Sequence, residues 1–247
     1  MVIVRCLKIT NMGYPDAYNY IQKGKWLNIH AHKRLYKNEV VVVSCAPGEA
    51  IAGADAGNVP VSAGIHPWYI QNNSSDDEQL ETLAEAVKKS GIIAVGEAGL
   101  DRATDLPADI QEKIFVAQAL IAAGSGKPVI IHCVRAYPDI IRLRKRFVDA
   151  PPWIVHGFGG NRQEALHLLR HDIYISLGAA LINETRKIRE AVMEIPPGRV
   201  FFETDEADTE VEDIYSYYSR FRGIDRERLR EQVWNNYKNV FGANIYH

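Results

Sequence analysis

Short apolar runs alternate along the chain with longer amphipathic stretches. Eight runs have this character, and they cover residues 26–30, 40–45, 59–65, 92–96, 128–132, 153–156, 173–177 and 200–204. The runs are rich in β-branched residues and lack a regular polar and apolar alternation, which is typical of parallel strands buried on both faces. The pattern therefore predicts repeated βα units and an α/β fold of the (β/α)8 TIM-barrel class.

Polar residues with helix-capping character separate several of these runs. Ser75 with Glu78 and Asn161 with Glu164 have the spacing of capping boxes. Pro107 and Asp225 mark two further helix starts. The sequence contains no internal repeat, low-complexity tract or linker, so residues 1–247 are interpreted as a single domain.

The first two connections between the predicted strands are short. A parallel crossover that includes a helix needs at least about 10–12 residues. Residues 31–39 are too few for a full helix and residues 46–58 are marginal, so we expect shortened βα connections after the first two strands. The segment 1–25 is too apolar for a disordered tail. We expect it to pack on the barrel as an N-terminal extension in place of the missing helix, with cover by a second subunit as the alternative.

Composition and charge limit the class of protein. The 247 residues are 47% hydrophobic and 24% charged, which is ordinary for a soluble globular protein. A net charge of −2 argues against a protein that coats nucleic acid, but not against an enzyme that holds one or two phosphates through metal ions. The three cysteines have no framework spacing, and no run has the length to cross a bilayer. We therefore expect a cytoplasmic protein without membrane partners, as a monomer rather than an oligomer.

Ligand-type side chains follow the predicted strands at their carboxyl ends, where barrel enzymes place functional residues. His30 and His32 are two positions apart in a strand, so their side chains share a face and can reach one ion. Buried ionisable groups without partners are costly, and a shared cation would remove that cost. The predicted metal ligands are His30, His32, Glu97, His132, His156 and Asp205.

Other candidate positions have structural interpretations. His167 and His171 are four residues apart on a predicted helix but lack the His-Glu-x-x-His pattern, so surface positions are favoured. The side chain of Cys133 should point away from that of its neighbour His132. The aromatic cluster of Tyr215, Tyr217, Tyr218 and Phe221 could stack bases, but packing in the core or at the rim is at least as consistent with its helical spacing.

Six motifs occur in a fixed order. They are His30-x-His32, Gly64-Ile-His-Pro67, Gly96-Glu-Ala-Gly-Leu-Asp101, His132-x-x-Arg135, His156-Gly-Phe-Gly-Gly160 and Glu203-Thr-Asp205. This ordered set resembles the TatD family of metal-dependent deoxyribonucleases, which are barrels of the amidohydrolase-like superfamily. The resemblance runs from about residue 28 to residue 241, and the block that begins at Gly96 is its most specific part.

The resemblance implies a site with two divalent metal ions, which could be Mg, Mn or Zn. It implies that His30, His32 and Asp205 hold one ion, that His132 and His156 hold the other, and that Glu97 bridges the two. The side-chain types alone do not select the metal.

The resemblance also implies the remaining catalytic and substrate roles. Asp205 would orient or deprotonate the attacking water, and Glu97 would take part in catalysis as the bridge. His66 would lie near the scissile phosphate without being a primary ligand. Arg102 and Arg135 would bind substrate phosphates. The implied activity is phosphodiester hydrolysis on DNA, from an end of the strand.

Three departures from the family pattern leave alternatives open. Asn28 stands where the family has Asp, Gly157 stands where it often has Cys, and the acids Glu206 and Asp208 follow Asp205. Acids beside the site would repel a DNA phosphate. The first alternative is therefore an amidohydrolase-type enzyme that hydrolyses a small amide, lactone or phosphoester on the same metals. The second is a non-catalytic metal-binding scaffold.

Overall fold

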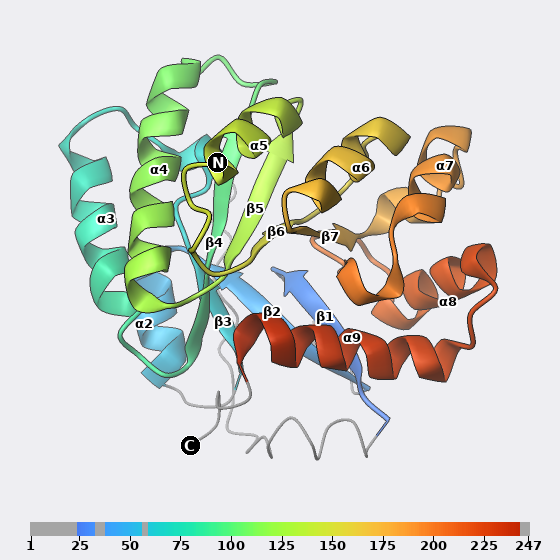
Figure 1. Ribbon diagram of the computed structural model, residues 1–247. Helices are drawn as coiled ribbons and strands as arrows, with labels where there is room; N and C mark the ends of the chain where they lie inside the picture. Colours follow the sequence, from blue (N-terminus) through green and yellow to red (C-terminus); the bar gives the residue numbers. More distant parts are fainter. Residues whose placement is uncertain (1–23, 33–37, 56–58, 243–247) are drawn as a thin grey trace.

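Eight parallel strands, paired in sequential order, form the centre of the molecule (Figure 1). The computed structural model describes residues 24–32, 38–55 and 59–242. The strands are β1 (Trp26–Ala31), β2 (Glu39–Cys45), β3 (Val61–Ala63), β4 (Ile92–Asp101), β5 (Val129–Val134), β6 (Trp153–Val155), β7 (Ile173–Leu177) and β8 (Val200–Phe202). A parallel bridge between Asp205 and Ala31 links the end of β8 to β1. The predicted (β/α)8 barrel is confirmed.

The helices surround the strands on the outside of the barrel (Figure 1). They are α2 (Pro47–Asp55), α3 (Ser74–Ala86), α4 (Ala108–Ser125), α5 (Tyr137–Arg144), α6 (Arg162–Arg170), α7 (Arg186–Glu194), α8 (Val211–Arg222) and α9 (Arg226–Phe241). Three short 3-10 helices are η1 (Pro67–Tyr69), η2 (Ala179–Leu181) and η3 (Pro197–Arg199). The last helix, α9, packs against β1, β8 and η3.

The connection after β2 is longer than the sequence pattern predicted. The strand β3 begins at Val61, two residues after the expected start, and the nine-residue helix α2 occupies the connection. The second connection, which was predicted to be marginal for a helix, thus holds the short helix α2. Residues 33–37 of the first connection lie outside the described residues, as do residues 1–23. The packing of the N-terminal segment thus stays a prediction.

The predicted helix starts are partly correct. Asn161 and Glu164 form the predicted capping box, and the Asp225 side chain accepts the N–H of Arg228. The start at Ser75 was wrong, because the side chain of Asn73 accepts the N–H of Ser75 and caps α3 two residues earlier than the box would.

Strand β4 is longer than its predicted run and continues through the motif that begins at Gly96. A Cβ at Gly96 would lie 2.5 Å from the carbonyl oxygen of Ile130, and one at Gly99 would lie 1.9 Å from that of His132. Only glycine can occupy both positions, because β4 approaches β5 so closely there. This close approach carries Glu97 and Asp101 to the carboxyl edge of the barrel on the same strand.

The interpretations of Cys133 and of the aromatic cluster as packing are confirmed. Cys133 is buried, and burial raises the pKa of its thiol to about 12, so the thiol is protonated at neutral pH. Tyr215 and Tyr218 are buried, and their hydroxyls donate to the carbonyl oxygens of Leu27 and Ile195. None of the described helices combines the length and the apolar content that a membrane crossing requires.

Candidate metal centre

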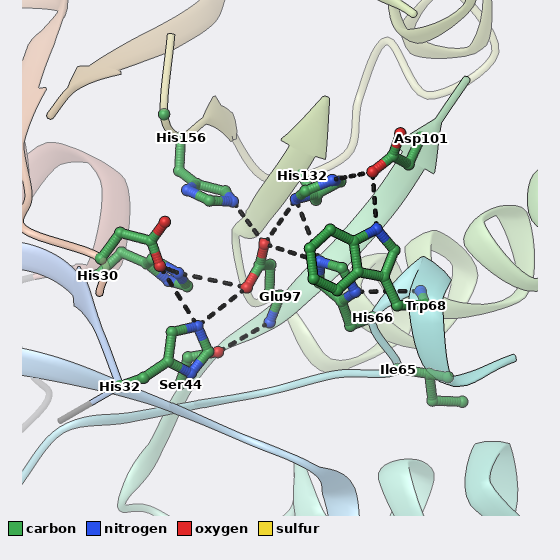
Figure 2. A network of polar contacts seen from close by, with 12 residues as sticks. His30, His32, Ser44, Ile65, His66, Trp68, Glu97, Asp101, His132 and His156 are labelled. Atoms are coloured by element: carbon green, nitrogen blue, oxygen red, sulfur yellow. Dashed lines mark hydrogen bonds and ion pairs between the residues drawn. The ribbon is translucent and has the colours of Figure 1, made fainter. Parts of the chain in front are cut away.

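The Glu97 carboxylate lies at the centre of the candidate site and is almost fully buried. Its Oε2 is 3.3 Å from Nε2 of His30 and 3.2 Å from Nε2 of His32. Its Oε1 is 2.8 Å from Nδ1 of His132 and 2.7 Å from Nε2 of His156. Figure 2 shows the four imidazoles around this carboxylate. The two oxygens of one side chain thus face two different pairs of histidines.

The first group combines strand β1 with the residues after β8. His30 is fully buried and His32 is partly exposed, with their rings nearly perpendicular. Oδ1 of Asp205 lies 3.6 Å from Nε2 of each histidine. The backbone holds this arrangement, because the N–H of Asp205 donates to the carbonyl oxygen of His30 at 3.0 Å. His30, His32, Asp205 and Oε2 of Glu97 can therefore surround one ion.

The second group consists of two histidines that are each oriented by another carboxylate. Nε2 of His132 lies 3.1 Å from Oδ2 of Asp101, and Nδ1 of His156 lies 3.3 Å from Oε1 of Glu203. When Nε2 of His132 and Nδ1 of His156 donate hydrogen bonds to these carboxylates, the other nitrogen of each ring is unprotonated. Its lone pair then points toward Glu97. A carboxylate behind a histidine is typical of metal ligands, because it fixes the tautomer and raises the basicity of the ring.

The sequence interpretation assigned no role to these two supporting carboxylates. Glu203 is fully buried and also accepts hydrogen bonds from the N–H of Gly157 and the hydroxyl of Ser176. Asp101 accepts from the N–H of Ala103 and from the indole of Trp68. The available signal was an acid inside or shortly after a buried apolar run, which has no solvent to stabilise it and therefore needs donors.

His66 contacts the same carboxylate but has different chemistry. Its Nε2 lies 3.2 Å from Oε1 of Glu97 and 3.2 Å from Nδ1 of His132. Its Nδ1 accepts the backbone N–H of Trp68 at 3.1 Å, so the neutral ring carries its proton on Nε2. Burial lowers the pKa of His66, which favours this neutral form. Although His66 is close enough to serve as a ligand, its Nε2 faces the site as a hydrogen-bond donor.

The carboxylates and histidines strongly perturb each other's ionisation. Burial alone would raise the pKa of Glu97, but His156 and His30 hold it well below its usual value. Burial and His156 lower the pKa of His30, but Glu97 and Asp205 bring it to about 9. The pKa of His156 is also raised, because Glu97 and Glu203 outweigh its burial. The buried carboxylates therefore attract positive charge, and a bound cation would displace protons from the histidines.

The donor set fits a divalent metal ion. Nε2 of His30 is buried and forms no hydrogen bond to the described residues, although two carboxylate oxygens lie within 3.6 Å. A cation between these groups would satisfy that nitrogen. Imidazole nitrogens combined with carboxylate oxygens suit first-row divalent ions, and the carboxylates also admit Mg.

Asn28, on the same strand as His30, forms hydrogen bonds that link neighbouring parts of the barrel. Its amide donates to Oγ1 of Thr204 at 2.9 Å and to Oε2 of Glu39 at 3.3 Å, and its oxygen accepts the N–H of Thr204. An aspartate here would place a second carboxylate beside that of Glu39, where the two charges would repel each other. The asparagine is thus matched to Glu39 and links β1, β2 and the end of β8.

The two predicted substrate-binding arginines have different surroundings. Arg102 donates through Nε and Nη2 to Oδ2 of Asp139, at 3.2 and 2.9 Å. Its Nη1 is buried without a hydrogen-bond partner among the described residues. Arg135 is exposed directly after β5, three residues beyond His132, and its φ is +53°. Both arginines follow the strands that supply Glu97 and His132.

An acidic pocket adjoins the first group. It has a volume of about 240 Å³ and includes Glu203, Asp205, Glu206 and Gly157 in its lining. The expected acid beside the site is therefore present in Glu206, whereas Asp208 is not part of this lining. His167 and His171 lie at the end of α6 and are not part of the cluster around Glu97.

A parallel barrel with histidines and carboxylates gathered at the carboxyl ends of its strands defines the class of metal-dependent barrel hydrolases. Residues 33–242 match the family described as TatD related DNase. The chain belongs to this family.

Individual relatives agree with this assignment. The chain is 31% identical over 205 residues to the 3'-5' ssDNA/RNA exonuclease TatD of Enterobacter lignolyticus, a match that covers 74% of the chain and 77% of that protein. It is 34% identical over 149 residues to the protein of the same description from Escherichia coli K12, covering 58% of the chain and 56% of that relative. The chain therefore spans just over half the length of the latter.

Solved structures confirm the fold. The TatD homologue YjjV from Escherichia coli K12 superimposes with a TM-score of 0.76 at 21% identity, over 88% of the chain and 98% of that protein. A TatD family hydrolase from Entamoeba histolytica superimposes with a TM-score of 0.71 at 17% identity, over 89% and 99%.

Proposed function

We propose that this protein is a nuclease that depends on two divalent metal ions and hydrolyses phosphodiester bonds of DNA from a strand end. The observation that carries the proposal is the division of Glu97, whose Oε2 faces His30 and His32 and whose Oε1 faces His132 and His156. A carboxylate shared in this way is suited to bridge two ions. Membership of the TatD family supports the choice of a phosphodiester substrate.

The side chains around Glu97 are assigned different catalytic roles. When bound, two divalent ions polarise the phosphoryl group, lower the pKa of water and neutralise the leaving oxygen. The Asp205 carboxylate is 45% exposed and therefore accessible to an attacking water, and His30 keeps it ionised by lowering its pKa against the effect of burial. We assign Asp205 as the proton acceptor. His66 directs its Nε2–H toward the Glu97 carboxylate, where the substrate phosphate would bind. We assign it as a hydrogen-bond donor to a phosphate oxygen.

We assign Arg102 and Arg135 to binding of the phosphate backbone of the substrate. Arg102 and the exposed Arg135 follow β4 and β5, the strands that supply Glu97 and His132. Guanidinium groups bind phosphate oxygens through charge-assisted hydrogen bonds. In the proposal, the two arginines bind phosphates of the strand. Asp205 accepts the proton of the water that attacks the terminal phosphodiester bond.

One observation favours a small-molecule substrate as the alternative. The pocket of about 240 Å³ beside Asp205 also contains Glu206 and buried Glu203, and its acids would repel a polyanion. A compact neutral amide or lactone would avoid that repulsion, and a small phosphoester would carry less negative charge than a DNA strand.

A substrate panel separates the two functions. The purified protein is stripped of metal by chelation, reloaded with Mg, Mn or Zn, and assayed on end-labelled single-stranded DNA, RNA and duplex DNA beside small phosphodiesters, amides and lactones. The proposal predicts stepwise shortening of the labelled strand that requires added metal. His156→Ala should abolish it, and His167→Ala serves as the matched histidine control on the surface. Turnover of a small molecule without any strand shortening would replace the proposal with the alternative.

A further inference from the structure

Trp68 is the exposed tryptophan of this chain. It is 63% exposed, whereas Trp26, Trp153 and Trp234 are all buried. Yet two hydrogen bonds fix the position of Trp68. Its indole Nε1–H donates to Oδ2 of Asp101 at 2.8 Å, and its backbone N–H donates to Nδ1 of His66 at 3.1 Å. A large aromatic surface is thus fixed in place while it remains in contact with water.

The ring lies directly beside the candidate metal centre, as Figure 2 shows. Its centroid is 5.1 Å from that of His66 and 6.2 Å from that of His132. The carboxylate oxygen that accepts from the indole also accepts from Nε2 of His132. Tyr69 adds a second aromatic side chain, 53% exposed, with its ring centroid 5.8 Å from that of His66.

We propose that Trp68 is a platform on which a nucleobase next to the scissile phosphate stacks, with Tyr69 at its side. This inference rests on the proposed function. Aromatic side chains bind the faces of bases in single strands with little dependence on sequence, since every base has such a face. A ring anchored by its edge offers that surface without a loss of side-chain freedom on binding.

The position of the platform also restricts the form of the substrate. A base inside a duplex is already stacked on its neighbours and paired, so it must be released before it can lie on Trp68. The site would therefore select unpaired or frayed ends. Metal ions held by the six ligands would act on the phosphate alone and would not by themselves distinguish paired from unpaired strands.

The test compares Trp68→Ala with Trp68→Phe, and uses Leu120→Ala on α4 as a control at an exposed apolar residue. Each protein hydrolyses a single-stranded oligonucleotide and the same strand with an abasic nucleotide next to the scissile phosphate. Trp68→Ala should raise KM for the normal strand by about tenfold, with kcat within about twofold. Trp68→Phe keeps a stacking face and should stay close to wild type. The abasic strand should raise KM for the wild-type protein but not for Trp68→Ala.

Two results would overturn the platform. If Trp68→Phe is as impaired as Trp68→Ala, the indole hydrogen bond to Asp101 matters and the stacking surface does not. If the wild-type protein does not distinguish the normal from the abasic strand, no base lies on the ring. Quenching of tryptophan fluorescence by each strand, measured with chelator present, gives a separate readout. Base-dependent quenching, combined with no hydrolysis of the same strand after Mg, Mn or Zn is added, would support the platform and refute the proposed nuclease activity.

Discussion

Replacing Glu203 with glutamine tests how the second group of ligands is held. Glu203 is fully buried and accepts from Nδ1 of His156, the N–H of Gly157 and the hydroxyl of Ser176. Glutamine has nearly the same shape and keeps one carbonyl oxygen for His156 and Gly157. The Ser176 hydroxyl can reverse and accept from the new amide. The substitution therefore removes the charge behind His156 while it preserves the packing.

The expected loss follows from this geometry. Removing the carboxylate behind a metal-bound histidine typically weakens metal affinity by about 10–100-fold. That factor corresponds to about 1.4–2.7 kcal/mol. Glu203→Ala would have a larger effect on folding, because it leaves the buried donors of His156 and Ser176 without an acceptor, at a cost of about 1–3 kcal/mol each. Glutamine is thus the variant that separates metal binding from stability.

The assay is a metal titration of the stripped protein by calorimetry, combined with thermal unfolding of the metal-free protein. Glu203→Gln should bind metal about 10–100-fold more weakly and unfold within a few degrees of wild type. Glu112→Gln, at a surface ion pair with Arg142, is the matched control and should bind metal normally. Wild-type affinity in Glu203→Gln would show that the Glu203 charge does not support His156.

Four further variants test the roles of individual side chains. Glu97→Ala should lose more than one equivalent of metal by elemental analysis, because its two oxygens face both groups; full occupancy would exclude the bridge. Asp205→Asn should cut kcat by about 10²–10⁴-fold, and a near-normal rate would remove it as the proton acceptor. Arg102→Ala and Arg135→Ala should raise KM for DNA without changing metal content. Unchanged KM in both would argue against phosphate binding by either arginine.

The barrel was predictable because its strands are buried on both faces. Continuous apolar runs marked all eight strands, and the ligand-type residues followed them at one edge. The prediction for β4 ended too early at Gly96, because glycine disfavours strands unless two backbones approach closely. That approach depends on the carbonyl oxygens of Ile130 and His132 in the neighbouring strand, which no local pattern encodes.

The six predicted ligands come together in the structure, but the groups that orient them were harder to find. Glu203 and Asp101 act through hydrogen bonds to histidines on other strands. The sequence pattern assigns no role to Trp68, because an exposed aromatic residue has no periodic signature. Its significance depends on the bond from its indole to Asp101, which joins η1 to β4. Such pairings depend on side-chain direction, which sequence spacing leaves open.

The bridge between the end of β8 and β1 has a consequence for how the protein assembles. The N–H of Asp205 donates to the carbonyl oxygen of His30, and the N–H of His32 faces the carbonyl oxygen of Asp205. The first group of ligands therefore exists only when the two ends of the sheet have met. This contact joins residues far apart in the sequence, and such contacts are slow to form. An ion held by these three residues would bind the closed ring and not the open one, and so would favour closure by mass action. A cation bound by the first group would therefore stabilise the closed barrel against the open one.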